Sequence, residues 1–399
     1  MIIRKLESFF GEQTGSSNVV LLSGPSGSGK TAVVRQLYGS SLWLDGNLPD
    51  EREFLRSMGT ASLLSRLGAN KCLVIDNAQR IENLETTVIS FAKELPGFRF
   101  IICSSFPGNK ASIKESMNSG SISDVKLLPL SFQELVKHHS LETEIQLIDH
   151  RIIFGYYPEV VANPGNEISK LHSLAGHALI KDILLREKIQ KTDGLEHLIQ
   201  LLALNIGRTV SNHDLGKQAG MTNETVDKYL QLLEKAFVIF RLEGYAKDLK
   251  NELVKSRKFY FYDTGIRNAV INQFGAFSLR NDAAALWENF IIAERRKYLL
   301  NNSIQANCYF WRTKDKAQVD YIEEYNGKLA AYQIFSASGK KVKFSKSFLD
   351  SYHPTETTGI NRENFQGWLW ENKVEKPDRK KIVVRRKDLR QDDISMEID

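Results

Sequence analysis

Apolar and polar positions follow two different periods along this chain. In the first third, short and largely apolar runs at 19–22, 73–75 and 98–103 end at serine or aspartate, which is typical of buried parallel strands. From residue 195 the sequence LEHLIQLLALNIG has apolar residues at helical spacing. The pattern therefore predicts a parallel α/β domain followed by a helical region.

The loop after the first predicted strand matches the Walker A pattern Gly-x-x-x-x-Gly-Lys-Thr. Its glycines permit backbone angles that a Cβ atom would block, so loop amides and the next helix can surround phosphate oxygens. We predict that Lys30 contacts the β- and γ-phosphates and that the Thr31 hydroxyl binds Mg²⁺. The alternative, a Gly/Ser-rich turn without a ligand, explains the strand–loop–helix order less well. The predicted nucleotide-binding residues are Gly24, Pro25, Ser26, Gly27, Ser28, Gly29, Lys30, Thr31 and Ala32.

A second strand supplies the acidic partner of this loop. The run LVID ends in Asp76, which we predict to hold Mg²⁺ beside Thr31; the alternative is an aspartate that only caps a strand end. Asn77 follows, and Asp76 and Asn77 are the predicted catalytic residues. An amide can orient water but cannot take its proton, and loss of a general base typically costs ~10²–10⁴-fold in rate. The sequence therefore predicts nucleotide binding more firmly than hydrolysis.

Four other polar residues near these strands are weaker candidates. Ser104 and Ser105 end the third strand, where a hydroxyl can lie near the γ-phosphate or simply form a turn. Glu82 and Glu85 follow Asn77 closely, but we do not expect either to replace the missing glutamate.

Residues 195–245 show the pattern of a helix-turn-helix followed by a strand. One helix ends at Gly207, a second begins after Ser211, and a third begins after Thr222 and serves as the candidate recognition helix. Glu224 on that helix makes it less basic than a DNA-backbone contact requires, so packing and oligomerisation are the alternative role. The candidate DNA contacts are Asn223, Thr225, Lys228 and Lys217.

The order of these motifs is similar to that of a bacterial family of AAA-like P-loop ATPases that carry a winged helix and a C-terminal domain of unknown function. In that family the second motif usually reads Asp-Glu-Ala-Gln, so only Asn77 departs from it, and Ser26 and Gly27 replace an Arg-Gln pair that is frequent in the loop. Further matching segments are 128–135, 155–161, 258–270, 286–294 and 309–323.

The resemblance implies an α/β fold with four parts. A P-loop parallel-sheet domain of the ASCE or AAA-like type would occupy residues 1–130, and a helical connector residues 131–192. A winged helix would follow at 193–246, and a restriction-endonuclease-like α/β domain at 247–399.

The resemblance also implies where a nuclease centre would lie in the C-terminal domain. In the restriction-endonuclease fold a helix Glu, a strand Asp and a Glu-x-Lys strand gather metal ions, and Glu288, followed by Asn289, and Asp320 match the first two. An amide brings no charge to hold a metal, so we expect this centre to be inert. The positions that have lost a charged group are Gln318, Gln333 and Phe335.

Charged residues around this centre have simpler interpretations. We expect the two surviving carboxylates to pair with Arg295, Arg312 or a helix end. Basic residues that could contact nucleic acid, or form a solvated tail, are Lys340, Lys341, Lys343, Lys346 and those of segment 378–390.

Composition restricts the class of protein. The chain has 399 residues, 42% of them hydrophobic, and a net charge of +6, which fits two or three folded domains and is compatible with nucleic acid without indicating it. No apolar run approaches the ~18 residues of a membrane helix, and the N-terminus does not resemble a signal peptide. With three widely spaced cysteines, we expect a cytoplasmic protein without a membrane partner.

Two functions remain open from the sequence. The first is an Mg²⁺-ATP-binding AAA-like protein with weak or absent hydrolysis, acting as a nucleotide-dependent switch or scaffold. The second is a DNA-binding protein that uses the winged helix and the basic C-terminal region and has a structural nucleotide site. Self-association is compatible with both, and Arg151 and Arg186 are the candidates for an arginine that completes a neighbour's site.

Overall fold

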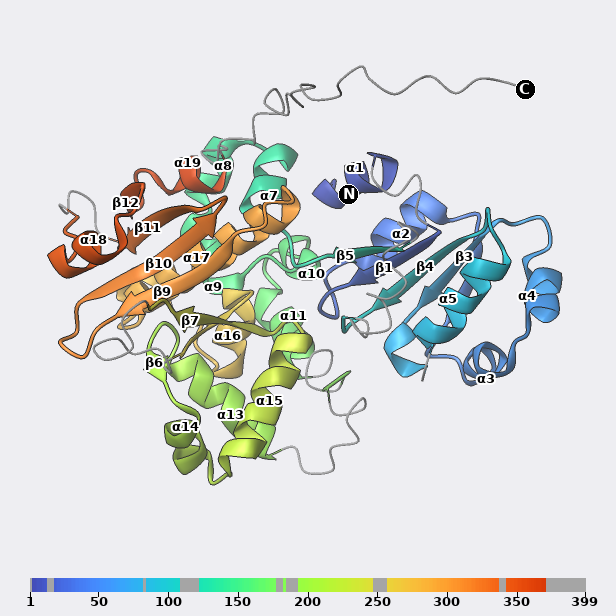
Figure 1. Ribbon diagram of the computed structural model, residues 1–399, viewed down its shortest axis with the longest axis horizontal. Coiled ribbons are helices and arrows are strands. Elements are labelled where there is room, and N and C mark those ends of the chain that lie inside the picture. The colour runs from blue at the N-terminus through green and yellow to red at the C-terminus, as the bar shows by residue number, and fades with distance from the viewer. Residues whose placement is uncertain are drawn as a thin grey trace, which may run out of the picture.

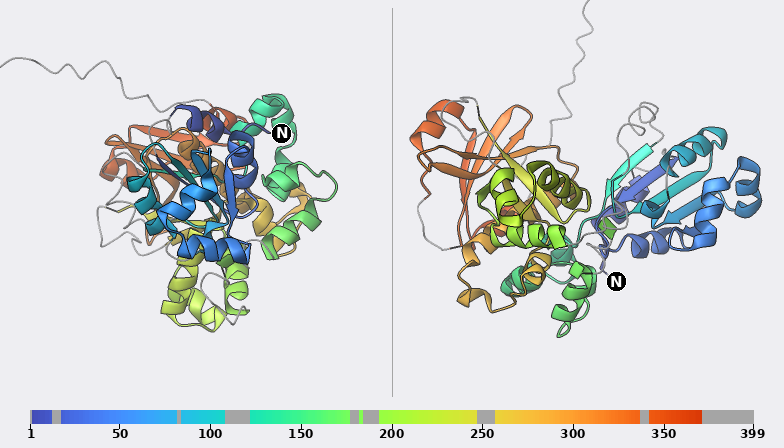
Figure 2. Two further views of the ribbon diagram at one scale, coloured as in Figure 1. Left: turned by 90° about the vertical axis from the view of Figure 1, so that its right-hand side faces the viewer. Right: turned by 90° about the horizontal axis from the view of Figure 1, so that it is seen from below.

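Two sheets with helices around them form the described part of the chain (Figure 1). In two further views the N-terminal sheet lies on one side and the C-terminal sheet on the other, with helices from the middle of the chain between them (Figure 2). The computed structural model describes residues 2–12, 18–81, 84–107, 122–176, 182–183, 193–246, 257–336 and 342–370.

The N-terminal domain is built on a parallel sheet with the strand order β2-β3-β4-β1-β5. Along β1, Val20 and Leu22 join one hydrophobic cluster while Val19 and Leu21 join another, so this strand is buried on both faces, as its apolar run predicted. The strands are β1 (Val19–Ser23), β2 (Leu42–Asp45), β3 (Cys72–Asp76), β4 (Arg99–Ser104) and β5 (Ile122–Lys126). The helices are α1 (Lys5–Glu12), α2 (Lys30–Tyr38), α3 (Pro49–Ser57), α4 (Thr60–Leu67), η1 (Ala78–Arg80) and α5 (Leu84–Glu94).

The middle of the chain is mainly helical. The helices predicted after Ser211 and Thr222 are confirmed, and each begins where that hydroxyl accepts a hydrogen bond from a backbone amide of the first turn. The connecting helices are α7 (Phe132–His138), α8 (Leu141–Gln146), α9 (Ile148–Phe154), α10 (Pro158–Val161) and α11 (Glu167–Ser173). They are followed by α13 (Asp193–Leu204), β6 (Thr209–Val210), α14 (Asn212–Ala219), α15 (Asn223–Lys235), β7 (Ile239–Gly244) and β8 (Arg257–Phe261).

The C-terminal part extends the hairpin of β7 and β8 into a seven-stranded sheet with the order β12-β11-β10-β9-β7-β8-β6. The junction is a short parallel pairing in which Glu243 lies beside Tyr309 and Gly244 beside Phe310. The remaining elements are α16 (Thr264–Val270), η3 (Phe277–Leu279), α17 (Ala283–Asn301), β9 (Asn307–Arg312), β10 (Gln318–Tyr325), β11 (Lys328–Ile334), α18 (Lys346–Tyr352), β12 (Glu356–Ile360) and α19 (Phe365–Leu369).

One hydrophobic core joins the middle and C-terminal parts. A single cluster of buried side chains runs from Phe106 to Leu369, and the buried helix α17 contributes Trp287 and Phe290 to it. The N-terminal sheet has its own two clusters. The chain therefore has one packing unit around the first sheet and a second, larger one around everything that follows.

Candidate nucleotide site

The Walker A loop between β1 and α2 has a backbone that requires glycine. A Cβ atom on Gly24 would lie 2.0 Å from the Leu127 carbonyl oxygen, and Gly27 and Gly29 have φ values of +80° and +96°. These positive angles favour glycine because it has no Cβ. Gly29 precedes the first residue of α2, so the loop leads directly into a helix N-terminus, the arrangement that binds phosphate groups.

Lys30 lies buried inside this loop. Its Nζ donates hydrogen bonds to the carbonyl oxygens of Gly24 and Pro25, at 2.8 and 3.0 Å. Burial lowers the pKa of Lys30 to about 8, although the nearby carboxylates of Asp76 and Asp182 oppose the shift. An anionic phosphate would therefore strengthen the charged form of this side chain.

The two predicted magnesium ligands lie together. The Thr31 hydroxyl donates to Asp76 Oδ2 at 2.7 Å, although the two residues are 45 positions apart. A hydroxyl and a carboxylate are oxygen ligands suited to Mg²⁺, whose other ligands in such sites are phosphates and water. Within the described ranges, no cluster of three or more His, Cys, Asp or Glu side chains offers an alternative metal site. Thr31 and Asp76 thus fit a magnesium ion bound together with a nucleotide.

Asn77 lies at the edge of the site with an unusual backbone. Its φ is +52°, in the left-handed region that asparagine tolerates better than most residues, and its amide nitrogen Nδ2 donates to Asp45 Oδ1 at 2.8 Å. Asp45 ends β2 beside Asp76. Sequence analysis missed Asp45; the signal available was an acidic residue at the end of the apolar run LWLD.

The weaker candidates have definite positions only in part. The Ser104 hydroxyl accepts from the Phe106 amide, which is a turn contact, and the Ser105 amide donates to Gln79 Oε1. Glu82 lies outside the described residues, and Glu85 belongs to α5 with a side chain outside them.

Sequence analysis also missed two charged residues beside the loop. Asp182 lies close enough to Lys30 to affect its pKa, and Arg80 Nη2 lies 3.8 Å from Asp182 Oδ1. Arg80 Nε and Asp182 Oδ2 are buried and lack a hydrogen-bond partner among the described residues. The connector thus places a carboxylate next to the phosphate-binding lysine.

Arg4 joins the Walker A loop to the connector. This buried side chain donates to the Ser28 carbonyl oxygen at 2.7 Å, to the Leu128 carbonyl oxygen at 2.7 Å and to Glu134 Oε1 at 2.9 Å. Burial tends to raise the pKa of Glu134, but the charge and hydrogen bonds of Arg4, with the Lys5 and Ser131 amides, outweigh it and lower the pKa below its usual value.

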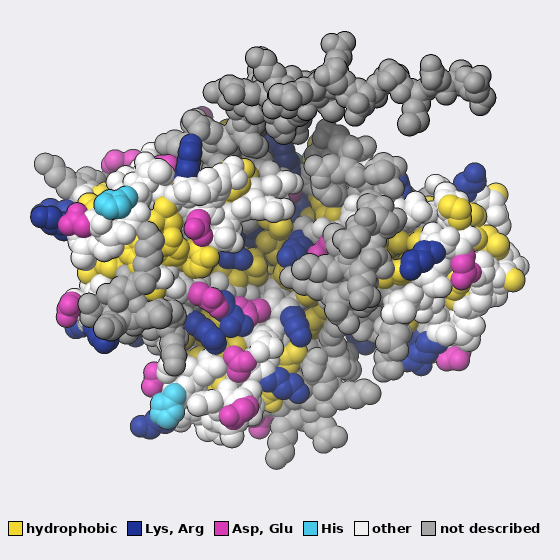
Figure 3. Space-filling view, in the orientation of Figure 1, with side chains coloured by type: hydrophobic (Ala, Val, Ile, Leu, Met, Phe, Trp, Pro, Cys, Tyr) yellow, Lys and Arg dark blue, Asp and Glu magenta, His cyan; other side chains and the backbone are white. Residues whose placement is uncertain are grey.

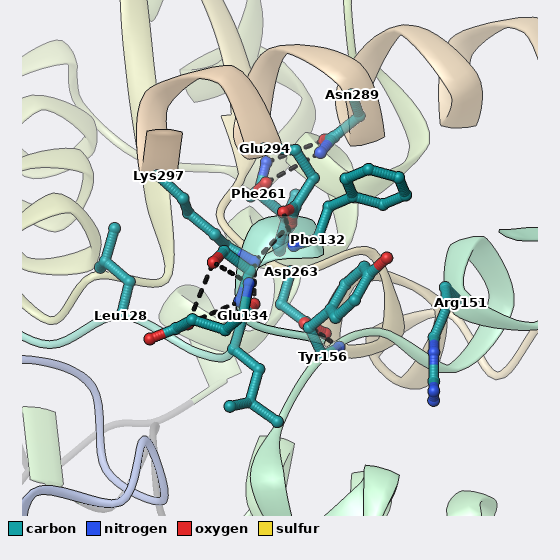
Figure 4. Close-up of polar contacts among 12 residues, drawn as sticks. Leu128, Phe132, Glu134, Arg151, Tyr156, Phe261, Asp263, Asn289, Glu294 and Lys297 are labelled. Atoms are coloured by element: carbon teal, nitrogen blue, oxygen red, sulfur yellow. Dashed lines mark hydrogen bonds and ion pairs between the residues drawn. The ribbon is translucent and has the colours of Figure 1, made fainter. Parts of the chain in front are cut away.

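A chain of buried polar contacts continues from this point into α17 (Figure 4). The Phe132 amide donates to Glu294 Oε2 at 2.7 Å, and Lys297 Nζ donates both to Glu294 Oε1 at 2.6 Å and to the Leu130 carbonyl oxygen at 3.0 Å. The start of α7 is therefore held by the N-terminal segment on one side and by α17 on the other. Contacts between the Walker A loop and the C-terminal part run through this short segment.

Arg151 does not fit its predicted role as an arginine that reaches a neighbouring subunit. It is buried and donates from Nε to Glu144 Oε1 at 3.1 Å, and in Figure 4 its side chain extends beside Tyr156. An arginine needed to balance a buried carboxylate is not free to act elsewhere. Arg186 lies outside the described residues.

The helix predicted to read DNA has few uncommitted polar groups. The Thr225 hydroxyl lies 3.1 Å from the Thr222 hydroxyl, which caps the helix, and Asp227 is bonded to Gln231. Lys217, Asn223 and Lys228 are exposed. On the face shown in Figure 3, basic and acidic side chains are interspersed.

The residues matched to a nuclease centre are brought together by the fold. Asp320 Oδ1 accepts from Gln318 Nε2 at 3.0 Å, and Gln333 Nε2 donates to the Gln318 carbonyl oxygen. Burial and the charge of Glu288 raise the pKa of Asp320 to about 6. The three strand positions and the helix glutamate therefore share one small region.

The predicted partners of these carboxylates are wrong. Glu288 instead accepts from Lys258 Nζ at 3.1 Å and from the Tyr260 hydroxyl at 2.5 Å, both from β8. Arg295 is bonded to Glu323, and Arg312 donates to the Thr209 hydroxyl. The error arose because β8 lies 28 or more residues from α17 in sequence, and its register against the helix is not visible in a local pattern.

Other candidates in this part have structural roles or lie outside the described residues. Asn289 pairs both amide atoms with the backbone of Phe261, and the Phe335 ring lies against Gly359. Lys343 and Lys346 are exposed, whereas Lys340, Lys341 and the segment 378–390 lie outside the described residues. None of the described helices is long and apolar enough to cross a membrane.

Comparison with known proteins identifies three segments. The profile of an AAA domain matches residues 16–136. Two domains of unknown function match residues 145–276 (DUF8612) and 283–392 (DUF4143).

Relatives and solved structures add similarity over longer stretches. An uncharacterized protein of Haemophilus influenzae is 30% identical over 192 residues, which is 45% of this chain and 47% of that protein, so the match spans about half of that relative. An uncharacterized protein of Mycobacterium tuberculosis is 23% identical over 338 residues, covering 82% of this chain and 72% of that protein. A Walker-type ATPase of Pyrococcus abyssi is 14% identical, with 68% and 96% of the two chains covered and a TM-score of 0.45.

The Walker A geometry and the profile match agree on the same residues. The sheet, the loop and the Thr31–Asp76 contact all fall inside the segment matched by the AAA profile. Residues 16–136 therefore form a P-loop domain of the AAA type, joined to segments that match two domains of unknown function.

Proposed function

We propose that this chain binds Mg²⁺-ATP in the Walker A loop and hydrolyses it slowly, so that nucleotide occupancy controls the arrangement of its parts. The observation that carries the proposal is the Thr31–Asp76 contact of 2.7 Å next to Asn77. Thr31 and Asp76 would hold the metal ion, which would supply positive charge to the phosphates. Asn77 provides an amide where a carboxylate would take the proton from water.

Contacts around the loop support a role as a switch. A Cβ atom on Gly27 would lie 2.6 Å from the Leu174 side chain and 3.5 Å from the Tyr157 ring, so the connector packs directly on the loop. Arg4 binds the same loop at Ser28. A nucleotide that changes the position of the loop would therefore change the packing of the connector, and through it that of α7 and α17.

Calorimetry with Mg²⁺-ATP, alongside a steady-state phosphate-release assay, tests this proposal. We expect saturable binding in the wild type, loss of binding in Lys30→Ala, and phosphate release near background. Wild-type protein that binds no Mg²⁺-ATP would disprove the proposal. Rapid phosphate release would disprove its second half, the slow hydrolysis.

The second candidate, a DNA-binding protein, has support from the order of elements. α13, β6, α14, α15 and the β7–β8 hairpin follow one another as in a winged helix. Against it, Glu224 is exposed on α15 together with Lys228, and the hairpin is committed to the large sheet. We propose that this winged helix serves mainly in packing; salt-dependent binding of duplex DNA, weakened when Lys217 and Lys228 are neutralised, would favour the alternative.

We further propose that the C-terminal nuclease-like domain is inert. The Lys258 ammonium already lies against Glu288 at 3.1 Å, and the neighbouring amides of Gln318 and Gln333 bring no charge to a metal. Metal-dependent cutting of plasmid DNA, lost in Glu288→Gln, would contradict this. The division at residues 130, 192 and 246 also remains a proposal, and the third boundary falls within a shared core.

A further inference from the structure

We infer that Asp45 is a positioning residue for ATP hydrolysis, which fixes the Asn77 amide so that its oxygen faces the attacking water. The inference rests on the proposed function, because it concerns the same nucleotide site. It begins with the hydrogen bond from Asn77 Nδ2 to Asp45 Oδ1 at 2.8 Å.

The fold places Asp45 at the nucleotide edge of the sheet. β2 and β3 are parallel, with Asp45 beside Asp76. Parallel strands have their carboxyl ends at one edge, where ligands of such sheets bind. Asp45 therefore lies one strand away from the predicted metal ligand and in contact with the residue that follows it.

The close approach of the two strand ends depends on Gly46. A Cβ atom at this position would lie 2.4 Å from the Asn77 carbonyl oxygen, and the Gly46 amide donates to the Asp76 carbonyl oxygen at 2.8 Å. Asp45 Oδ1 also accepts from the Asn47 amide at 2.9 Å. The carboxylate of Asp45 is thus held in place by its own turn.

The backbone of Asn77 is held equally firmly. Its amide donates to Asp76 Oδ1 at 2.9 Å and its carbonyl oxygen accepts from the Arg80 amide at 3.1 Å. With the backbone fixed at a φ of +52°, the orientation of the side-chain amide is the freedom that remains. That orientation decides whether the site presents a donor or an acceptor.

A carboxylate settles the orientation because it only accepts hydrogen bonds. It holds the Asn77 NH₂ group toward itself and leaves Oδ1 as an acceptor. Oδ1 then accepts a hydrogen bond from water, whose oxygen bonds to the γ-phosphorus as the bond to the β–γ bridging oxygen breaks. The electron pair of that bond leaves with ADP. The water proton passes to the phosphate product, because the amide cannot take it.

This arrangement separates the carboxylate from the usual position by one strand. The pair consists of an acceptor on β2 and a donor on β3. Asn77→Glu alone would place two carboxylates in contact and lose the hydrogen bond. Asp45→Asn combined with Asn77→Glu restores a donor–acceptor pair with the roles exchanged, and brings the carboxylate to the position next to Asp76.

The test is a double-mutant cycle on kcat for Mg²⁺-ATP, with affinity measured by calorimetry for every variant. We expect Asp45→Asn to lower kcat several-fold in the wild-type background, because two amides pair in either orientation. In the Asn77→Glu background the same change should raise kcat, and the double variant should exceed wild type by about tenfold or more, as expected for a restored base. Nucleotide affinity should change little throughout.

The matched control is Asp50→Asn, an exposed aspartate on α3, which should leave kcat unchanged in both backgrounds. If Asp45→Asn alters kcat by the same factor in both backgrounds, or alters neither, Asp45 is only structural and the inference is wrong. If wild type and variants bind no Mg²⁺-ATP at all, the proposed function fails and this inference falls with it.

Discussion

Lys30 is the residue whose chemistry depends most directly on its surroundings. Burial among the carbonyl oxygens of its own loop lowers its pKa to about 8. Bound phosphates would favour the charged form, so binding above pH 8 requires the uptake of a proton. The lysine therefore links nucleotide affinity to pH.

We predict that the affinity for Mg²⁺-ATP falls between pH 7 and pH 9, by at most about tenfold per pH unit above pH 8. Calorimetry at three pH values measures this, and heats in buffers of different ionisation enthalpy report the proton uptake. Lys30→Arg, which keeps its charge over the whole range, is the control and should flatten the profile. A wild-type affinity that does not change with pH would contradict the prediction.

The residues of the site divide by how far their partners lie along the chain. The Walker A glycines, Lys30 and Thr31 form a local motif, and Asp76 ends an apolar strand, so all were predictable from sequence. Asp45 and Arg4 were not, because their roles depend on contacts 32 residues away and on contacts up to 130 residues away. No local period encodes such contacts, which exist only after the sheet order is set.

At the scale of elements, the start of α7 holds the most concentrated polar contacts. Glu134 caps this helix through Ser131 and also forms the buried ion pair with Arg4. Removing one partner of such a pair leaves an uncompensated buried charge. The short segment between β5 and α7 is therefore expected to be sensitive to substitution.

We predict that Arg4→Met destabilises the folded chain by about 3–5 kcal/mol, because Glu134 loses its partner and two backbone carbonyls lose a donor. Thermal and urea denaturation measure the change. Arg56→Met on the exposed side of α3 is the control and should lie within about 0.5 kcal/mol of wild type. Equal stability of the two variants would show that the Arg4 contacts contribute little.

A second element-scale prediction concerns β10. Burial and the charge of Glu288 raise the pKa of Asp320 from its ordinary value of 3.8 to about 6, although Lys258 opposes the shift. The folded chain thus holds a proton there more tightly than the unfolded chain. Its stability should fall as the pH rises from about 4 to about 6, and a cost of about 3 kcal/mol should remain at higher pH.

Asp320→Asn should remove most of this dependence. We expect the variant to be more stable than wild type at pH 8 by about 1–3 kcal/mol and to lose this advantage near pH 4. Urea denaturation at pH 4, 6 and 8 gives the difference. Asp350→Asn, an exposed aspartate on α18, should show no such trend, and a constant difference for Asp320→Asn would refute the explanation.

At the scale of the whole molecule, the hydrophobic core does not follow the predicted division at residue 246. The cluster from Phe106 to Leu369 includes side chains from both sides of that boundary, and β7 pairs with β9 across it. The helices of the middle region were predictable from their period and caps. The sharing of one sheet was not, because a pairing of two residues leaves no pattern in the sequence.

A chain truncated after residue 246 should therefore fail to fold in its middle region. It would keep both clusters of the N-terminal sheet but expose apolar side chains of α13 and α15 that now pack on the C-terminal part. Circular dichroism and soluble yield measure this, and the full chain serves as the control. A cooperative unfolding transition of the truncated middle region would contradict the prediction.

The central claim is that the site holds Mg²⁺-ATP longer than it takes to release it, without cleaving it. A single-turnover experiment tests this directly, with protein in excess over γ-labelled ATP and Mg²⁺, a chase of unlabelled ATP, and the label followed with time. The account predicts that most of the bound label leaves as intact ATP, because the Asn77 amide orients water without taking its proton. Conversion of most of the bound ATP to free phosphate before it dissociates would contradict it.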